Sequence, residues 1–315
     1  MVSKKVKDLI YLVLRILFSF LILFFIFKKI EVKYLFEGLK DINYFYFFIS
    51  FIFYWITLFF LSYRWKILLI PFLKKSISIF EIFKVYMLGM LINTITPATT
   101  GVDISRGIIL SKYTNGYSKG FASVLVDRIT GMIGIFLIAF IFSIFSLKGK
   151  ENLFILILIF LLLSIFSLFL FYIPFIKRIF EKIKIFKKLL NFYYAMNSYK
   201  KNFKLILYST FLAMPVQISF SLIAFFVSKS FGIEGSINLF ILYVPIINAL
   251  NVIPFTISGF GIREAGFLIF FKDYFLKEKI ILTSIFYWLV SAIGNLPALY
   301  YLFKNPLKEE KWKEF

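Results

Sequence analysis

The chain of 315 residues contains no cysteine and no histidine. Their absence excludes disulfide bonds, thiolate or imidazole zinc sites, and any catalyst built on these two side chains. Acidic residues are scarce, with 16 Asp and Glu against 37 Lys and Arg. The sequence also lacks a Gly-x-x-x-x-Gly-Lys-Ser/Thr run, which would bind the phosphates of a nucleotide. We therefore expect no metal site, no cofactor and no ATP-driven step.

Apolar side chains dominate what is present. Hydrophobic residues make up 61% of the chain, aromatic residues 22%, and the mean hydropathy is +0.90. Many segments approach the ~20 apolar residues that a bilayer core requires, which indicates an all-α polytopic membrane protein of the cell (inner or plasma) membrane. No small-x-small cleavage site follows the first segment, so it predicts an uncleaved span. The segments are 9–27, 42–61, 79–96, 121–145, 153–173, 205–229, 237–272 and 280–303.

One polar stretch occurs twice, at 93–107 and at 251–264. Both copies contain Asn, Ile, Pro, Thr, Gly, Ile and Arg in the same order, and corresponding prolines and arginines are 157 positions apart. This offset also superimposes neighbouring apolar segments, which predicts a duplication with repeat 1 at about 1–150 and repeat 2 at about 151–315. Paired interruptions of this kind indicate the central site of a transporter. The predicted structural breaks are Asn93, Pro97, Gly101, Asn251 and Pro254.

The basic residues of the loops distinguish two topologies. If every segment crossed the membrane, the strongly basic linker 174–204 would lie outside, against the positive-inside rule. If the third and seventh segments are re-entrant, both termini and this linker lie in the cytoplasm. Each half then has about three spanning helices plus one re-entrant or broken helix pair, and the two halves are inverted repeats. Non-helical backbone at that depth must line a cavity or be buried in protein, so the motifs predict a cavity near the midplane.

Residues 174–200 of the linker alternate apolar side chains with Lys and Arg at helical spacing. This pattern predicts an amphipathic helix on the cytoplasmic face. It is compatible with binding of anionic inner-leaflet lipids and with a purely topogenic linker between the repeats. In a membrane protein, topogenic charges and contacts with anionic lipid headgroups account for the net charge of +21. We therefore do not expect nucleic acid as a partner.

The second motif has the features of a phosphate site. Ser258 or Thr256 is a suitable N-cap for a half-helix that begins near Gly259, whose free N–H groups would point at a phosphate. Gly261 permits close approach of the backbone, and Arg263 offers a bidentate fork. The alternative is a tight turn between helices in which Arg263 pairs with Glu264.

The first motif offers a similar set of side chains. Thr99 or Thr100 is a candidate cap, Asp103 follows in the first turn, and Arg106 lies one turn on. Asp103 and Arg106 suit either headgroup binding or a local ion pair.

Two further charges, Asp127 and Arg128, stand at the start of the fourth apolar segment. One interpretation is interfacial snorkelling near the membrane boundary. The other places Arg128 on a headgroup path or in a buried pair with Asp103.

These motifs resemble those of the flippase-like family, the transmembrane region of lysylphosphatidylglycerol synthase and its stand-alone relatives. The likeness rests on 97–106, on Val126-Asp127-Arg128 and, most specifically, on 254–264, and it extends over nearly the whole chain. Val102 stands where the family often has a second glycine. The resemblance implies translocation of an amphiphile with a charged headgroup. It does not imply aminoacyl transfer, because the sequence contains no counterpart of the synthase's soluble catalytic domain.

The leading hypothesis is therefore a flippase for a phosphate-bearing lipid or lipid-linked precursor, and not an enzyme. One alternative is a membrane-embedded lipid-modifying enzyme with Asp103, Asp127 or Glu264 as base. Another is a scaffold for a separate lipid or glycosyl transferase, and a homo-oligomer stays open. The candidate substrate-binding residues are Thr99, Asp103, Arg106, Arg128, Ser258, Gly259, Gly261, Arg263 and Glu264.

Overall fold

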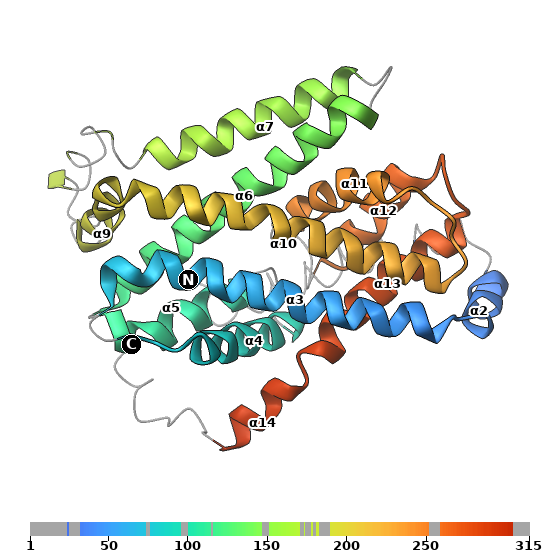
Figure 1. Cartoon of the computed structure of the whole chain (residues 1–315), viewed down its shortest axis with the longest axis horizontal. Helices are drawn as coiled ribbons and strands as arrows, with labels where there is room; N and C mark the ends of the chain where they lie inside the picture. Colours follow the sequence, from blue (N-terminus) through green and yellow to red (C-terminus); the bar gives the residue numbers. More distant parts are fainter. Residues whose placement is uncertain are drawn as a thin grey trace, which may run out of the picture.

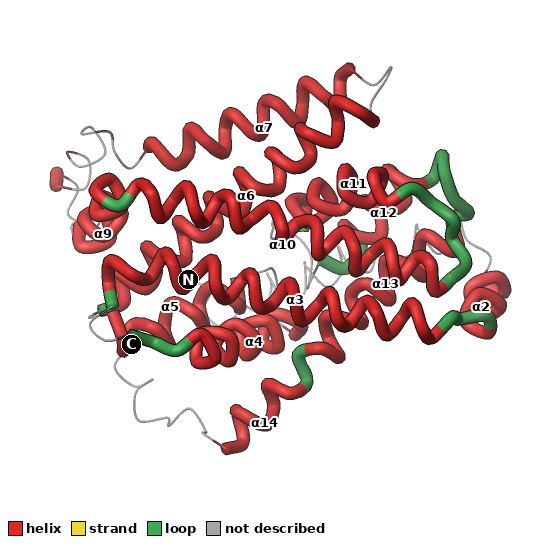
Figure 2. Tube along the Cα trace, viewed as in Figure 1, coloured by secondary structure: helices red, strands yellow, loops and turns green. Residues whose placement is uncertain are grey.

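The computed structural model describes residues 24, 32–73, 76–95, 100–114, 116–146, 151–170, 173, 178, 181–182, 190–251 and 259–304. Within these ranges the regular structure is helical throughout, joined by short loops (Figures 1 and 2). The helices are α2 (Val32–Lys40), α3 (Tyr44–Leu69), the 3-10 turn η1 (Ile70–Phe72), α4 (Ile79–Ile95), α5 (Thr100–Thr114), α6 (Tyr117–Ser146), α7 (Glu151–Leu170), α9 (Leu190–Lys201), α10 (Phe203–Ser230), α11 (Ile237–Leu250), α12 (Ile262–Phe271), α13 (Lys277–Gly294) and α14 (Pro297–Lys304).

In the described part of the chain, five helical segments are long and apolar enough to cross a membrane. They correspond to the second, fourth, fifth, sixth and eighth predicted segments, which confirms the all-α polytopic class. The first predicted segment, 9–27, lies almost wholly outside the described residues. The five segments are Tyr44–Phe72, Tyr117–Phe145, Glu151–Leu170, Phe203–Ser230 and Lys277–Tyr301.

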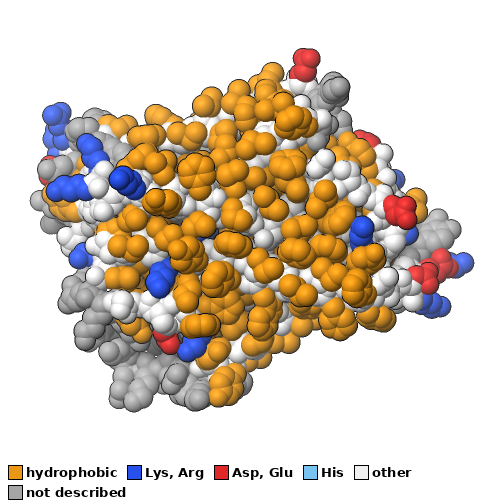
Figure 3. Space-filling view, viewed as in Figure 1, with side chains coloured by type: hydrophobic (Ala, Val, Ile, Leu, Met, Phe, Trp, Pro, Cys, Tyr) orange, Lys and Arg blue, Asp and Glu red, His pale blue; other side chains and the backbone are white. Residues whose placement is uncertain are grey.

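Helix α7 shows why the surface belongs in lipid. It buries only a narrow stripe of side chains, Ile157, Leu161, Ser164 and Leu168, at intervals of three or four residues. Large apolar side chains such as Phe166 cover the rest of the helix and are exposed. Figure 3 shows the same property for one whole face, where hydrophobic side chains form a broad band and the charged groups gather towards its two ends. A soluble monomer rarely exposes so large an apolar area, whereas a bilayer covers it.

Helices α3 and α10 run antiparallel through the centre of the molecule (Figure 1). The N–H of Asn43, before α3, donates to the carbonyl of Ser230 at the end of α10 (2.9 Å). At the other end, the Tyr199 hydroxyl, just before α10, donates to the carbonyl of Leu68 (2.6 Å). Helix α10 also packs on α6, where a Cβ at Gly134 would overlap Ala213. Small residues thus allow the close helix contacts on which packing in a membrane depends.

The third and seventh predicted segments each contribute to a pair of short helices. The third, 79–96, corresponds to α4 and is followed by the additional helix α5, and the seventh, 237–272, is divided into α11 and α12. The breaks between them, 96–99 and 252–258, lie outside the described residues, and with them Pro97, Thr99, Pro254, Thr256 and Ser258. In Figure 1 the α4–α5 pair lies towards the same end of the molecule as α9, and α11 and α12 lie towards the opposite end.

Two predicted boundaries were wrong, and both errors affect the site. Helix α3 continues to Leu69, eight residues beyond the predicted end at 61, so Arg64 is buried inside a span and not in a loop. Helix α6 begins at Tyr117, so Asp127 and Arg128 lie well inside it. Since the Asp127 side chain is 2% exposed, interfacial snorkelling is excluded for it.

Most of the predicted amphipathic helix lies outside the described residues, which resume as α9 at Leu190. Helix α9 buries Tyr193, Ala195, Met196 and Tyr199 against the bundle. Its last turn carries Lys200 and Lys201. The described part of the linker is thus basic, as the sequence predicts for the whole linker.

A candidate headgroup cavity

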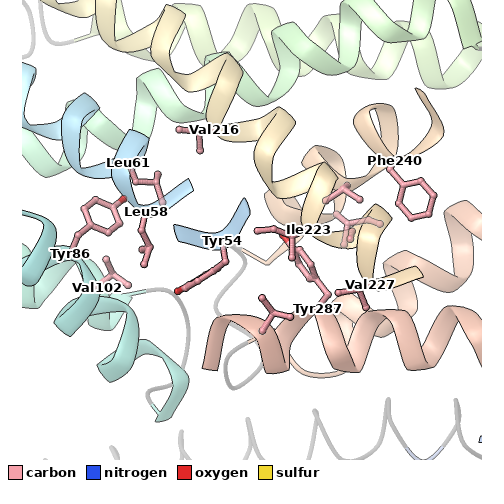
Figure 4. Packing of buried hydrophobic residues seen from close by; sticks show 14 of the residues in the cluster. Tyr54, Leu58, Leu61, Tyr86, Val102, Val216, Ile223, Val227, Phe240 and Tyr287 are labelled. Atoms are coloured by element: carbon pink, nitrogen blue, oxygen red, sulfur yellow. The ribbon is translucent and has the colours of Figure 1, made fainter. Parts of the chain in front are cut away.

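A cavity of about 270 Å³ lies where the central helices and both broken segments meet. Figure 4 shows part of its apolar wall: Tyr54 of α3 lies near the centre of the view, with Tyr86 and Val102 on one side and Ile223 and Tyr287 on the other. The polar lining is unusual for a membrane interior. It comprises Arg64, Asn93, Thr94, Asp103, Arg106, Asp127, Arg128, Gln217, Asn248, Asn251, Arg263, Ser291 and Asn295.

Asp127 on α6 is the centre of a buried ion cluster. Its Oδ1 accepts from Nε of Arg64 on α3 (2.9 Å), and its Oδ2 accepts from Nη1 of Arg106 on α5 (2.8 Å). The backbone carbonyl of Asp127 also accepts from Nη2 of Arg64 (3.3 Å). A Cβ at Gly131, one turn later, would lie 3.1 Å from Nη1 of Arg64, so a glycine there leaves room for the guanidinium group.

Asp103 forms the second carboxylate of this cluster. Its Oδ1 accepts from Nη2 of Arg106 (3.2 Å), and its Oδ2 accepts from Nε of Arg128 on α6 (2.6 Å). Both predicted contacts of Asp103, the local pair with Arg106 and the pair with Arg128, are therefore present. Asp103 and Arg128 are partly exposed, at 23% and 26%, whereas Arg106 and Asp127 are almost fully buried. The cluster thus extends from the protein interior towards an accessible edge.

Arg106 is fixed by aromatic rings as well as by carboxylates. Its guanidinium carbon lies 4.6 Å from the ring centroids of both Trp65 and Tyr86. The faces of these rings attract a cation, and stacking restricts the guanidinium plane. Arg106 is therefore held firmly, and one of its donors, Nε, is buried without a partner.

The arginine of the second motif has a different partner. Nη2 of Arg263 donates to Oε1 of the adjacent Glu264 (2.6 Å), which also accepts from Ser284 on α13 (3.2 Å). Oε2 of Glu264 accepts from the backbone N–H of Gly261 (2.6 Å). The pairing of Arg263 with Glu264, foreseen as the alternative to a phosphate site, is thus present. Glu264 also caps the start of α12, because it accepts the N–H of the N-cap residue Gly261 from position N3.

The 157-residue offset relates the partners of the two arginines. It places Arg106 on Arg263 and Asp127 on Ser284. Both equivalent side chains contact their arginine: Asp127 at 2.8 Å and Ser284 at 3.4 Å. The second half replaces the aspartate by a serine and obtains its carboxylate from Glu264.

Several carboxamide groups around the cavity are incompletely bonded. The side-chain oxygens of Asn93, Gln217 and Asn251 are buried without a hydrogen-bond partner. The Asn295 amide, next to the Tyr54 hydroxyl, donates back to the carbonyl of Ser291 (2.7 Å). Unpaired buried acceptors are rare in folded proteins, since each carries a desolvation cost. Their concentration at one cavity indicates a place prepared for a polar ligand or water.

A comparison with models of known protein families assigns the chain to a family. The family model described as the lysylphosphatidylglycerol synthase TM region matches residues 12–298. The chain belongs to this family. The match confirms the resemblance inferred from the motifs, and it includes every residue of the cavity. A search of the curated proteins gave no significant match.

The predicted binding and break residues of this member of the family fall into three groups. Asp103, Arg106, Arg128 and Arg263 line the cavity together with the predicted breaks Asn93 and Asn251. Gly101, Gly259, Gly261 and Glu264 do not belong to its described lining. Thr99 and Ser258 lie outside the described residues.

The glycines of the second motif have a backbone role. Gly259 and Gly261 have φ values of +77° and +89°, which side chains with a Cβ rarely adopt. A Cβ on Gly259 would also lie 2.8 Å from Oδ1 of Asn251. The predicted N-cap near Ser258 was wrong, because α12 starts at Ile262 with Gly261 as its N-cap.

Sequence reasoning missed Arg64, Trp65, Tyr86 and Gln217. A signal existed for Arg64, since it is an ionisable residue within an apolar helix, but the predicted boundary at 61 placed it in a loop. The other three side chains are ordinary in apolar helices, so only the packing reveals their role. In the described ranges no group of three or more His, Cys, Asp or Glu side chains is arranged to hold a metal ion.

Proposed function

We propose that this protein moves a phosphate-bearing lipid or lipid-linked precursor between the two leaflets of the membrane. The observation that supports this proposal best is that Arg106 and Arg263, 157 positions apart, line the same cavity within a largely apolar helical bundle. Arginine forks match phosphate oxygens, and ionisable groups at membrane depth are costly enough to suggest a function. The apolar walls of the cavity, which include Met132 and Phe220, suit the acyl chains.

The proposal includes two inverted, re-entrant halves. Three contacts support the duplication: α3 packs on α4 as α10 packs on α11, α5 on α6 as α12 on α13, and α4 on α5 as α11 on α12. The opposite positions of the two broken pairs in Figure 1 support the inversion. In this arrangement each motif enters from a different side of the membrane, which suits alternating access to one central site.

We propose further that the end containing α9 faces the cytoplasm. Lys200 and Lys201 of α9, Lys204 at the start of α10 and Lys66 near the end of α3 make this end basic. The opposite end mixes both signs, for example Lys272 with Asp273 and Lys277 with Glu278. The positive-inside rule then assigns the basic end to the inner face of the cell membrane.

We do not propose an enzyme. A general base needs a carboxylate that is free to take a proton, whereas Asp103 and Asp127 each accept bonds from two arginines. Glu264 is occupied by Arg263, Ser284 and the N–H of Gly261. The carboxylates are thus arranged to orient cations, which suits binding better than proton transfer.

Reconstitution into liposomes tests the proposal. Purified protein should accelerate the transfer of a fluorescent phospholipid between leaflets, measured by bleaching the outer leaflet with dithionite. The double variant Arg106→Ala/Arg263→Ala should lose this activity, and the matched charge change Lys200→Ala/Lys272→Ala at exposed positions should retain it. Equal rates in liposomes with the double variant and with wild type would contradict the proposed role of the cavity.

A further inference from the structure

The lining of the cavity is suited to a ligand that carries hydrogen-bond donors as well as a negative charge. Four unpaired carboxamide oxygens, those of Asn93, Gln217, Asn251 and Asn295, belong to residues of its lining. Gln217 is only 5% exposed, so bulk water does not compensate its oxygen. A ligand that carries several O–H or N–H groups would satisfy these acceptors, whereas a bare phosphate would not.

The charges at the helix ends also distinguish a part of the site that suits an anion from a part that suits hydrogen-bond donors. Asn93 lies in the last turn of α4, and Asn251 is the C-cap of α11, so both oxygens accompany helix C-termini with their partial negative charge. Arg263 lies in the first turn of α12, where the partial charge is positive, and Arg106 lies in the second turn of α5, one turn after Asp103. The site therefore combines an anion-binding part with a donor-accepting part.

The formal charges around the cavity favour neutral donors, such as hydroxyl groups, over ammonium groups. Among the described residues, the ionisable side chains that line the cavity are Arg64, Arg106, Arg128, Arg263, Asp103 and Asp127. Together with Glu264, the partner of Arg263, they leave one positive charge in excess. The undescribed residues of the two motifs, 96–99 and 252–258, contain no ionisable side chain. A headgroup with a net charge of about −1 would balance the site, whereas an additional ammonium group would be desolvated without a free carboxylate to receive it.

We infer that the headgroup is a phosphodiester linked to a neutral, hydroxyl-bearing group such as glycerol or a sugar. This inference rests on the proposed lipid translocation and specifies its substrate class. It separates such a lipid from lysylphosphatidylglycerol, whose two amino groups outweigh its single phosphate. The apolar lining, which includes Leu61, Met90 and Ile223, favours the lipid over a soluble phosphodiester or phosphate ester.

Four lipids with identical acyl chains test the inference by native mass spectrometry of the purified protein. Phosphatidylglycerol has the charge and the hydroxyls, phosphatidylmethanol has the charge alone, phosphatidylethanolamine has an ammonium group, and lysylphosphatidylglycerol is net cationic. Phosphatidylglycerol should bind about fivefold or more tightly than phosphatidylmethanol, the scale of one neutral hydrogen bond. The two amine-bearing lipids should bind more weakly than phosphatidylmethanol. Glycerol 3-phosphate should not compete at similar concentrations.

The variant Gln217→Leu isolates the hydroxyl contact. It replaces a buried carboxamide by an apolar group, so it should reduce the ratio of phosphatidylglycerol to phosphatidylmethanol binding to about one. Its melting temperature without lipid should not fall, because it removes an unpaired acceptor. Asn238→Leu changes an exposed carboxamide at the start of α11 and should keep the wild-type ratio.

The possible failures are distinguishable. Lysylphosphatidylglycerol binding as tightly as phosphatidylglycerol, or an unchanged ratio in Gln217→Leu, would overturn the inferred headgroup class. Effective competition by glycerol 3-phosphate would overturn the assignment to a lipid. The proposed function fails separately, if none of the four lipids changes leaflet faster in proteoliposomes than in protein-free vesicles.

Discussion

Arg106 of the first motif and Asp127 of the following helix form a buried ion pair, with 2.8 Å between Nη1 and Oδ2. Arg64 reaches the other oxygen of the same carboxylate. One aspartate therefore fixes two guanidinium groups from two different helices at the cavity. The cluster contains more arginines than carboxylates, so each carboxylate is shared by two arginines. The loss of one member therefore affects the others, and this dependence leads to specific predictions.

Asp127→Asn should strongly destabilise the fold. The substitution leaves Arg64 and Arg106 without their shared carboxylate in a site that excludes water. Removal of one partner of a buried pair typically costs about 3–5 kcal/mol, so the melting temperature in detergent should fall clearly.

Two comparisons make this result specific. Glu81→Gln removes an exposed ion pair with Lys84 and should change stability by less than about 1 kcal/mol. Arg64→Gln combined with Asp127→Asn removes one charge of each sign and should recover part of the lost stability. Purely additive losses in the double variant would argue against a coupled cluster.

Arg106→Lys should impair the site although it keeps the charge. A lysine has no planar fork to bond both Asp103 and Asp127, and it cannot stack in the same way between Trp65 and Tyr86. We expect about 1–3 kcal/mol lower stability, the scale of lost hydrogen bonds to charged groups, and slower lipid transfer. Lys84→Arg, at an exposed pair, is the control and should behave as wild type. Wild-type transfer by Arg106→Lys would show that charge alone suffices.

Gly261→Ala should weaken the second motif through the backbone. Gly261 has φ +89°, and forcing an alanine into such a conformation costs about 1–3 kcal/mol. The turn also presents the Gly261 N–H to Glu264, which in turn orients Arg263. Thermal unfolding and transfer assays should both decline. Unchanged stability of Gly261→Ala would mean that the turn relaxes without cost.

The absence of cysteine allows a direct test of the inverted topology. Single cysteines at exposed positions flank each broken pair: Ser76→Cys and Tyr113→Cys beside α4 and α5, and Glu234→Cys and Lys272→Cys beside α11 and α12. In intact cells, a membrane-impermeant maleimide should label the latter two and spare the former two. If Ser76→Cys and Tyr113→Cys differ in labelling, the first pair crosses the membrane and the re-entrant topology is wrong.

The sequence predicted the fold class and the position of the site because both depend on strong local signals. Long apolar runs have few alternatives to membrane helices. Pro97, Pro254 and Gly259 fall between the paired helices and correctly located the division into α4–α5 and α11–α12, whereas the predicted break at Gly101 was wrong, because Gly101 lies inside α5. The pair of Arg128 with Asp103 was one of the interpretations that the sequence left open, and the structure contains it.

The remaining contacts depend on how distant helices pack. Arg64 and Lys66 are both charged residues near the same end of α3, so the local signal does not show which of the two side chains meets Asp127. The role of Gln217 arises only because α10 faces the cavity. The cap of α12 was misassigned because Glu264, and not a hydroxyl, bonds the N–H of Gly261. Tertiary geometry decides the first two cases, whereas the cap of α12 is a local contact between residues three positions apart.

The most direct test of the central claim is a cryo-electron microscopy map of the protein in nanodiscs that contain phosphatidylglycerol. The account predicts density for a phosphate within hydrogen-bond distance of Arg106 or Arg263 and headgroup density near Gln217. Phosphatidylglycerol headgroups ordered only at the bilayer surface, with a cavity that holds no lipid, would contradict it.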